Sequence, residues 1–436
     1  MMPRPPNYPW MTRALFALAM VSLGTSSAFA QSSGFDVFSP DTVTLAGNGR
    51  LVGVDGERSW LDDGFGKLAY GGRDEGEPGD FRIRPRFGEA ALIWQPRFGW
   101  ALSGTVVGIA QRKGDHIEAG LSEAFVGFKP LSGGSIKLSA RAGLMWPPVS
   151  LEHSGPEWAV TETITPSAIN SWIGEEVKVV GLESSLLATR GRHKITATAA
   201  LFDVNDTAGA LLSFRGWGLH DVKALAFHTQ PLPEPNEFIE YVQPRFTHPV
   251  KEMDGGFLKR PGFYAKLAWQ PPFPVRIEAL HYDNNSDPES VNDALEWGWR
   301  TKFNNFGLVA DLGAKTQLRA QAIRGRTRMG ITDNGAIWVD NRFRSAFALV
   351  TQRFGISSIT GRIEAFGTRN KGGELVSDDD EHGWAVTLAG RHPLGEYATV
   401  LVEALHVSSR REAREREGMA PRQDQNQIQA QLRLRW

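Results

Sequence analysis

The sequence contains no cysteine, so disulfide bonds, thiol catalysis and thiolate metal ligands are all excluded. Long apolar runs are also missing. After residue 30, no stretch approaches the roughly 18 uncharged apolar residues that a membrane-spanning helix needs. A chain of 436 residues without disulfides requires another source of rigidity. A closed, hydrogen-bonded β-barrel supplies it, because closure leaves no unpaired edge strand.

The first 30 residues have the features of an export signal. Arg13 supplies a positive charge, residues 14–23 form a short apolar run, and Ala28 and Ala30 satisfy the small-x-small rule for cleavage. We therefore expect a signal peptide at residues 1–30 and a mature chain at residues 31–436. Cleavage removes two arginines and leaves 46 basic against 49 acidic residues, a net charge of −3. Such a mildly acidic chain is not expected to bind nucleic acid.

Glycine and aromatic residues are abundant, although the mean hydropathy is only −0.29. The chain has 47 glycines, 14 tryptophans and 24 phenylalanines. A soluble β-protein hides apolar side chains in its core, whereas a membrane barrel turns them outward in a thin band and keeps polar residues inside. The average hydropathy of such a barrel is therefore close to that of a soluble protein. The composition favours the membrane barrel.

Period-two alternation is clearest at the C-terminus. The odd positions from Gln427 to Arg435 are polar, and the even positions from Ile428 to Trp436 are apolar. A strand with this pattern has one polar and one apolar face. The same alternation at residues 136–146, 263–270 and 295–303 predicts further strands of this kind.

Segments of about ten residues bounded by turn signals predict sixteen strands. We place them at residues 42–54, 81–94, 99–111, 117–129, 134–146, 175–189, 193–203, 260–270, 274–283, 292–303, 315–328, 342–353, 357–367, 380–391, 396–409 and 423–436. Their links mostly alternate in length, as expected for short periplasmic turns and long extracellular loops. The fold class is therefore an all-β, transmembrane antiparallel barrel.

Parts of this layout fit less well. The outer link at 113–116 is short, the inner link at 304–314 is long, and the alternation slips near Ile323, which suggests a bulge. The very long outer loop at 204–259 contains two segments, 208–214 and 219–227, that could form another hairpin. Eighteen strands are therefore an alternative.

The final strand, which ends on the aromatic Trp436, resembles the C-terminal assembly signal of bacterial outer-membrane barrels. Residues 31–436 as a whole resemble a sixteen-strand Gram-negative porin and are most similar to the phosphate-selective porin O and P type. The resemblance implies an outer-membrane location, contact with lipid and lipopolysaccharide, passive diffusion of small hydrophilic solutes, and a homotrimer. Lysine is sparse beside arginine, which departs from the lysine cluster of a phosphate ladder.

Function in a wide, wet barrel is expected from inward-facing charges. Alternation places these pore-lining arginines on the inward face: Arg82, Arg84, Arg86, Arg141, Arg300, Arg319, Arg342, Arg344, Arg362, Arg433 and Arg435. The inward acids are fewer: Glu278, Glu296, Glu364 and Glu403. This asymmetry predicts a positive inner wall that favours anions.

The loop after the fifth strand, residues 147–174, is the candidate constriction loop. Its candidate residues are Glu152, His153, Glu157, Trp158, Glu162 and Trp172. In sixteen-strand general porins, the loop at this position folds into the barrel and often places acids opposite an arginine ladder. The resemblance implies the same arrangement here.

The sequence carries no catalytic signature. We find no HExxH spacing, no GxSxG and no glycine-rich phosphate loop after a strand, so we expect no enzyme activity, no cofactor and no metal. Two alternatives to a porin-like channel stay open. One is an outer-membrane barrel enzyme of the lipase or protease type, and the other is a surface binding or adhesion protein that acts through the 204–259 loop.

Two charged segments lie in predicted outer loops. The acids of residues 378–381 suit a solvated loop better than a calcium site, although clustered carboxylates are the ligands that calcium prefers. Arg410, Arg411, Arg414 and Arg416 alternate with glutamates. We expect these arginines to contact lipopolysaccharide phosphates.

Overall fold

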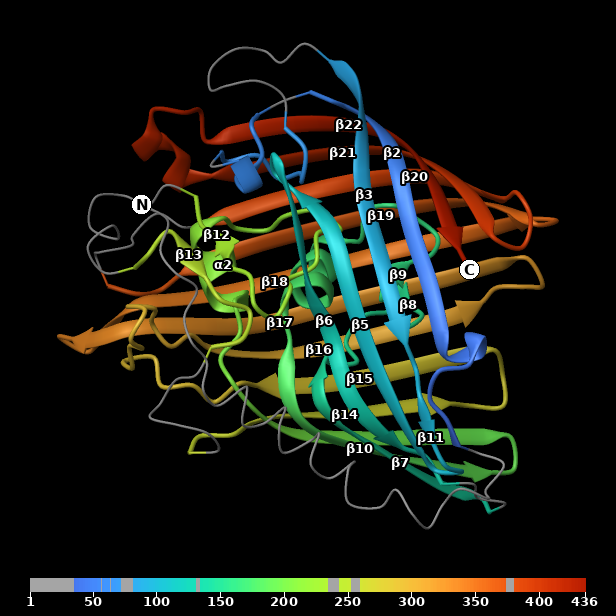
Figure 1. Ribbon diagram of the computed structural model, residues 1–436. Coiled ribbons are helices and arrows are strands. Elements are labelled where there is room, and N and C mark those ends of the chain that lie inside the picture. The colour runs from blue at the N-terminus through green and yellow to red at the C-terminus, as the bar shows by residue number, and fades with distance from the viewer. Residues whose placement is uncertain are drawn as a thin grey trace.

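Sixteen long antiparallel strands close into a barrel in the computed structural model of the chain (Figure 1). The structure describes residues 35–55, 57–62, 64–71, 81–130, 134–233, 243–251, 259–373 and 380–436. The predicted signal peptide at residues 1–30 lies outside these ranges. Strands β2 and β22 pair with each other from Ala46 and Arg435 to Val54 and Gln427, and this pairing closes the barrel.

The barrel strands follow one another around the ring in chain order. They are β2 (Val43–Val54), β3 (Arg82–Trp94), β5 (Leu102–Lys113), β6 (His116–Phe128), β7 (Ile136–Met145), β10 (Val179–Arg190), β11 (His193–Asp203), β14 (Gly262–Gln270), β15 (Val275–Asp283), β16 (Arg300–Asp311), β17 (Thr316–Asp333), β18 (Ala336–Phe354), β19 (Ser357–Asn370), β20 (Glu381–Pro393), β21 (Ala398–Arg411) and β22 (Arg422–Arg435). The two-residue strands β1 (Phe35–Asp36) and β4 (Arg97–Phe98) extend the sheet beside β5.

Short elements occupy the connections between these strands. They are β8 (His153–Ser154), β9 (Ala159–Val160), the π-helix η3 (Asn170–Gly174), α2 (Ala208–Phe214), β12 (Gln230–Pro231) and β13 (Phe246–Thr247), with 3-10 turns η1 (Pro40–Thr42), η2 (Trp60–Asp62) and η5 (Glu412–Glu417). Among the described residues, no helix has the length and apolar character needed to span a membrane.

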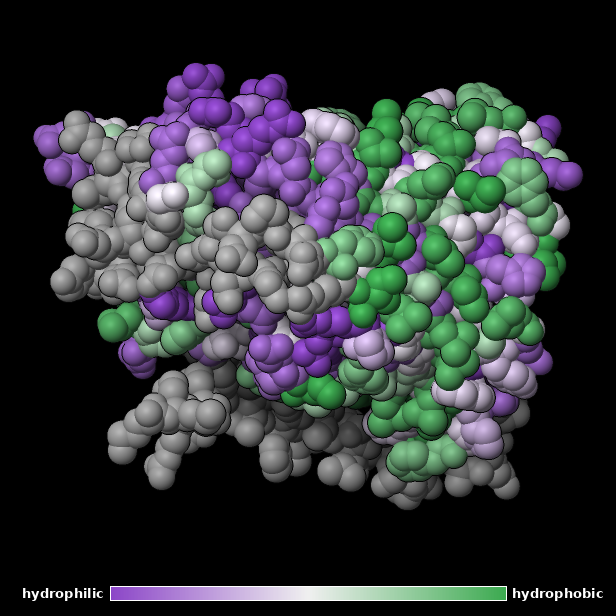
Figure 2. Space-filling model, turned by 90° about the horizontal axis from the view of Figure 1, so that it is seen from above, coloured by the Kyte–Doolittle hydropathy of each residue, from purple (hydrophilic) through white to green (hydrophobic). Residues whose placement is uncertain are grey.

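Apolar side chains form a band on the outside of the barrel. Ile363 is 63% exposed, Phe306 60% and Leu388 58%, although all three are large and apolar. Apolar side chains gather at one end of the face shown in Figure 2, and hydrophilic side chains gather at the other. Aromatic rings including Trp269 and Trp436 are exposed at the strand ends next to the short turns. An outward apolar band of this kind is the surface that faces lipid.

The predicted barrel is confirmed, but one strand is displaced. Strand β16 covers Arg300–Asp311 rather than residues 292–303. The preceding residues alternate because Trp297 and Trp299 pack into the mouth of the barrel, against Trp338 and Phe214, and not because they face lipid. With this shift the inner turn shortens to residues 312–315, so the expectation of a long inner link was wrong.

The number of strands is sixteen and not eighteen. Residues 208–214 form helix α2 instead of a strand, so they make no hairpin with residues 219–227. Leu219 forms one isolated bridge, with Leu68. The slip near Ile323 has a different cause from the bulge we expected. Ile323 is buried in the interior core, and the register of β17 shifts only between Met329 and Thr332.

Candidate functional site in the barrel lumen

Two long connections fold into the barrel and fill much of its lumen. The first is residues 146–178, between β7 and β10, and the second is residues 204–233, which contains α2. Their side chains form a core with the inner wall. Trp172 has no exposed surface and meets Trp217 and Phe343 edge-on, with ring centroids 5.3 and 4.6 Å apart. We call these segments the first and second inserted segments.

Arg362 on β19 holds the first inserted segment against the wall. Its Nη1 donates to Glu152 Oε1 at 3.0 Å and to the Thr165 carbonyl at 2.8 Å, and its Nε donates to Glu364 Oε1 at 2.9 Å. Nη2 donates to the Pro166 carbonyl at 3.1 Å. The side chain has no exposed surface. A buried guanidinium with two carboxylates and two carbonyls is fully engaged, so it anchors the segment and does not line an open passage.

Carboxylates of the wall bind the backbone of the same segment. The N–H of Ala168 donates to Glu364 at 2.6 Å, and that of Ile164 donates to Glu403 at 2.7 Å. Arg433 donates to the carbonyls of Val160 and Thr163. Charged side chains of strands β19, β21 and β22 therefore bind the backbone of residues 160–168. A loop backbone buried in a barrel needs such partners, because water cannot reach its polar groups.

Glu152, in the first inserted segment, is a buried carboxylate that stays ionised. Burial would raise its pKa, but Arg362 and the hydrogen bonds from Ser167 and Asn170 outweigh burial and lower the pKa. The carboxylate accepts bonds from the Ser167 N–H at 3.0 Å and from Asn170 Nδ2 at 2.6 Å. The charged form of Glu152 is thus part of the folded interior.

Ion pairs also hold the second inserted segment, both to the first inserted segment and to the barrel wall. Arg215 Nη1 lies 2.5 Å from Glu176 Oε1, and the guanidinium stacks over Trp60, 4.3 Å from the ring centre. Further along, Asp221 binds Arg50 of β2 at 2.8 Å. Lys223 binds Glu89 of β3 at 2.6 Å. Both inserted segments are therefore fastened at several points around the ring.

A cavity of about 240 Å³ remains in the lumen at the end with the short turns. Its charged lining residues are Glu89, Glu157, Glu175, Asp221, Glu396, Lys223, Arg391, Arg433 and Arg435. Five acids thus face four bases. At the other end of the barrel, Trp60, Trp297 and Trp299 pack into an apolar cluster with helix α2. The described part of the lumen thus has a charged cavity near the short turns and an apolar cluster near the long loops.

Most of the predicted pore-lining arginines do lie on the inward face. Arg84 and Arg86 lie opposite Val52 and Arg50 of β2, whose side chains are buried in the interior. The others contact interior groups: Arg141 binds Glu183, Arg319 donates to the Leu151 carbonyl, and Arg362, Arg433 and Arg435 bind the first inserted segment. The side chain of Arg82 lies outside the described residues.

Three predicted pore-lining arginines face the opposite way. Arg300, Arg342 and Arg344 alternate with buried Thr301, Phe343 and Ser345 and point out of the barrel. The prediction assumed that polar residues face the lumen. Near these arginines, the inward side chains of β16–β18 include Phe303, Ile323 and Phe343, which belong to the same apolar core as the tryptophans of the inserted segments. The arginines therefore occupy the outer face.

The candidate constriction residues all belong to the first inserted segment. Glu152 binds Arg362, His153 binds Glu175, Glu157 binds Arg435, and Glu162 accepts from Ser358 at 3.1 Å. Trp158 stacks on His153, with ring centroids 5.2 Å apart, and Trp172 lies in the central core. All six residues therefore lie in the lumen.

Sequence reasoning missed the second inserted segment. It treated residues 204–259 as an outer loop, whereas residues 204–233 lie inside the barrel; residues 234–242 and 252–258 are outside the described ranges. Asp221 and Lys223 therefore did not appear as lumen residues. A usable signal was the run of apolar and small residues at 208–226, which an exposed loop would not contain.

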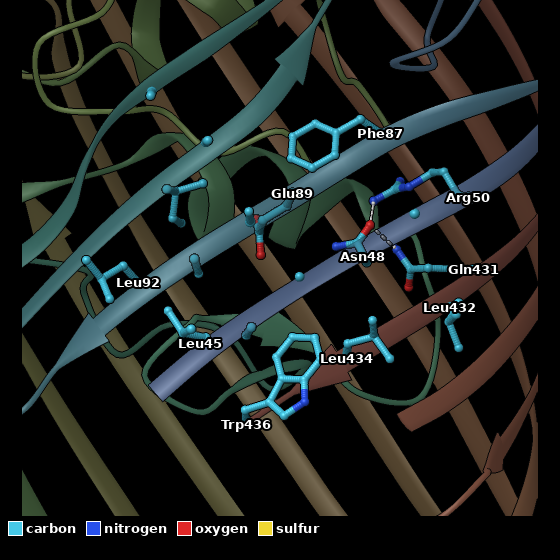
Figure 3. Close-up of a pocket in the computed structure, with 18 of the residues that line it drawn as sticks. Leu45, Asn48, Arg50, Phe87, Glu89, Leu92, Gln431, Leu432, Leu434 and Trp436 are labelled. Carbon is cyan, nitrogen blue, oxygen red and sulfur yellow. Dashed lines mark hydrogen bonds between the residues drawn. The ribbon is translucent and has the colours of Figure 1, made fainter. Parts of the chain in front are cut away.

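A further groove lies on the outside of the barrel and is not part of the lumen. It measures about 1060 Å³ and runs over β2, β3 and β22. Figure 3 shows Leu45, Leu434 and Trp436 together at one end of it. Behind it, Asn48 accepts hydrogen bonds from Arg50 and Gln431, each at 2.9 Å. Most of its lining residues are apolar, as expected for a surface against lipid.

Solved structures of outer-membrane channels share this architecture. The outer membrane channel DcaP of Acinetobacter baumannii matches with a TM-score of 0.58 at 9% identity, covering 92% of this chain and 99% of that one. The chain therefore shares the barrel fold of that outer membrane channel. OmpT of Vibrio cholerae matches at a TM-score of 0.47 and 8% identity, covering 92% and 99% of the two chains. No protein-family model and no curated protein matches the sequence.

Proposed function

We propose that this porin-type barrel is a narrow channel for small hydrophilic solutes. The observation that carries the proposal is the anchoring of the first inserted segment across the lumen by Arg362, Glu364 and Glu403. A segment fixed in this way sets the width of the route, which is how charged constrictions select solutes. The similarity in fold to DcaP, which is described as an outer membrane channel, supports the same function.

The phosphate-selective type and a preference for anions are not supported. Three of the arginines on which that preference rested face outward, and the lumen cavity carries five acidic and four basic residues. A mixed lining of this kind screens both signs of charge. We therefore expect a weakly selective channel, with a reversal potential close to zero in a salt gradient.

The absence of cysteine makes a direct test of the route simple, because a single introduced thiol is the only one in the chain. Thr161 lines the lumen cavity, whereas Arg192 lies in an exposed turn. In planar bilayers we expect steady, small currents from the refolded protein. A charged thiol reagent should reduce the current of T161C and leave that of R192C unchanged. The proposal is wrong if neither protein conducts, or if both variants respond alike.

The enzyme alternative has one observation in its favour. Ser150 Oγ lies 2.7 Å from His153 Nδ1, and His153 Nε2 lies 2.8 Å from Glu175 Oε1, which is the order of a hydrolytic triad. However, the His153 side chain has no exposed surface, and Trp158 stacks on its ring. A substrate cannot approach an imidazole enclosed in this way. We infer that the triad-like chain is structural and that the barrel is not an enzyme.

The adhesion alternative loses most of its basis, because residues 204–233 are buried in the lumen instead of being displayed. The homotrimer stays a proposal that rests on the resemblance to porins. Gel migration of the native protein before and after heating tests it, since a trimer should run as one slow band that heating converts to a monomer. A band of monomer size before heating would contradict it.

A further inference from the structure

A row of basic side chains crosses the outer face of six neighbouring strands, β17 to β22. Residues directly opposite each other on antiparallel strands lie on the same face, about 5 Å apart. The register pairs Arg324 with Arg344, Arg344 with Gly367, Gly367 with His382, His382 with Arg410, and Arg410 with Arg422. We call Arg324, Arg344, His382, Arg410 and Arg422 the basic row.

The basic row points away from the lumen and is exposed. The side chains of Arg410 and Arg422 are 48% and 69% exposed, whereas their neighbours Arg411 and Gln423 are buried. Arg411 turns inward to the Ser213 carbonyl, and Arg414 is also buried. Of the four arginines expected to contact lipopolysaccharide, only Arg410 belongs to this outer surface, and the side chain of Arg416 is outside the described residues.

Like charges placed opposite each other on a sheet destabilise it. Arg324 and Arg344 form such a pair, and neither side chain makes a hydrogen bond or ion pair within the described part of the chain. Arg410 and Arg422 each bind one local acid, Glu412 and Asp424. The row therefore concentrates positive charge, and an anion bound from outside would relieve the repulsion.

The height of the row matches a membrane boundary. Arg344 lies ten residues before Phe354, which ends β18 at a short turn. Ten residues span about 33 Å along a strand, or about 25 Å along the membrane normal at a tilt of about 40°. The apolar band of such barrels is about 25 Å tall. The basic row therefore lies where the hydrocarbon ends on the side of the long loops.

A groove joins the row to the apolar band below it. The groove measures about 870 Å³ and is lined by Arg344, His382, Arg410 and Arg422 at one end. The next residues toward the short turns are Ala346, Ala365 and Trp384, which the register aligns across β18, β19 and β20. The surface thus changes from guanidinium groups to apolar side chains within one step along the strands. This pattern suits an amphiphile with an anionic head.

We propose that this groove binds a phosphorylated lipid of the outer leaflet. Its phosphates lie against Arg344, Arg410 and Arg422, and an acyl chain lies over Trp384. Arginine is well suited to this role because its planar fork binds phosphate through two parallel hydrogen bonds. The lipid of that leaflet is lipopolysaccharide, whose lipid A carries the phosphates. The proposal rests on the outer-membrane location and not on the transport activity.

The test compares binding of lipid A to the refolded full-length barrel in detergent. The variant R344Q/R410Q/R422Q removes three charges from the groove. The control R190Q/R192Q/R353Q removes three exposed arginines at the end with the short turns. We expect the groove variant to bind labelled lipid A on the order of 100-fold more weakly, because each basic residue contributes about a fivefold gain near an anionic surface. The control should bind within twofold of the original protein.

Further arms separate the possible sources of the effect. Lipid A without phosphates should bind weakly to all three proteins, and R344K/R410K/R422K should recover most of the affinity if charge is the cause. Heat-modified gel migration confirms that each variant forms the barrel. Equal binding of phosphorylated and dephosphorylated lipid A would overturn the proposal. So would full competition by millimolar inorganic phosphate, or crosslinks at Arg344 that show a second copy covering the groove.

Discussion

Arg362 Nη1 lies 3.0 Å from Glu152 Oε1 and joins the barrel wall to the segment that crosses the lumen. Both side chains are buried, and Arg362 also binds Glu364. Removal of the guanidinium leaves two carboxylates buried without a counter-charge, which costs about 3–5 kcal/mol. This contact is therefore the best place to release the segment.

We expect Arg362→Gln to raise the single-channel conductance and to lower the temperature of thermal unfolding. Arg319→Gln is the matched control, because Arg319 also contacts the first inserted segment, at the Leu151 carbonyl, but has no carboxylate partner. Its conductance should stay near that of the original protein. If the two variants conduct equally, the segment is held elsewhere.

A second prediction concerns pH. Burial would raise the pKa of Glu296, but Lys251 and His248 outweigh burial and lower the pKa from 4.5 to about 2. The His248 N–H donates to this carboxylate at 2.9 Å. Because the pKa is lower in the folded state, the contribution of Glu296 is complete above pH 4.5. It is lost as the pH falls from 4.5 to 2, and its size is about 3 kcal/mol.

Hydrogen exchange of residues 292–299 at pH 6 and at pH 3 measures this effect. The protection factor, which is the intrinsic exchange rate at each pH divided by the observed rate, should be lower at pH 3 than at pH 6 in the original protein. In Glu296→Gln it should be low at both pH values. Glu289→Gln serves as control, because Glu289 lies in the same loop and only accepts from the Thr332 N–H at 3.3 Å. Equal protection at both pH values in the original protein would rule out this role of Glu296.

The third prediction concerns the core inside the barrel. Trp172 has no exposed surface and donates from Nε1 to the Ala208 carbonyl at 2.8 Å, which joins the two inserted segments. Trp172→Ala should lower the free energy of unfolding by about 3–5 kcal/mol. Trp100→Ala, at a position 67% exposed on the outside, should have a clearly smaller effect. Equal losses in urea titration would show that the lumen core adds little stability.

A fourth prediction separates structural from catalytic use of Ser150. Its hydroxyl contacts His153 Nδ1 and accepts from the N–H groups of Glu152 and His153, each at 3.1 Å. Ser150→Ala should loosen this turn by about 1 kcal/mol, measured by thermal unfolding. The original protein should show no hydrolysis of short p-nitrophenyl esters above buffer. An esterase signal that disappears in Ser150→Ala would instead favour the enzyme alternative.

The positions of the barrel strands could be read from the sequence. Alternation from Ile428 to Trp436 and the short turns near 271–274 and 355–356 identify strands, because lipid on one side imposes a local period of two. The displaced strand β16 shows the limit of this reasoning. Trp297 and Trp299 continue the same alternation before β16 begins, but they are buried in the apolar cluster at the mouth of the barrel.

The direction in which some polar residues face could not be read in this way. Alternation shows that Arg342 and Arg344 share one face with each other, but not whether that face is the lumen. The inserted segments settle the question, because Trp172 and Trp217 require apolar neighbours such as Phe343. The segments themselves are recognised only through partners far away in the chain, such as Asp221 with Arg50.

By itself, the sequence predicted export, and it determined that this chain forms a sixteen-strand barrel with an apolar outer band, since the barrel follows from composition and from contacts between neighbours in the chain. Only the tertiary structure decided what fills the barrel and which arginines face outward. The physical reason is that a strand's two faces are distinguished by what packs against them. Here one of those partners is another part of the same chain, more than one hundred residues away.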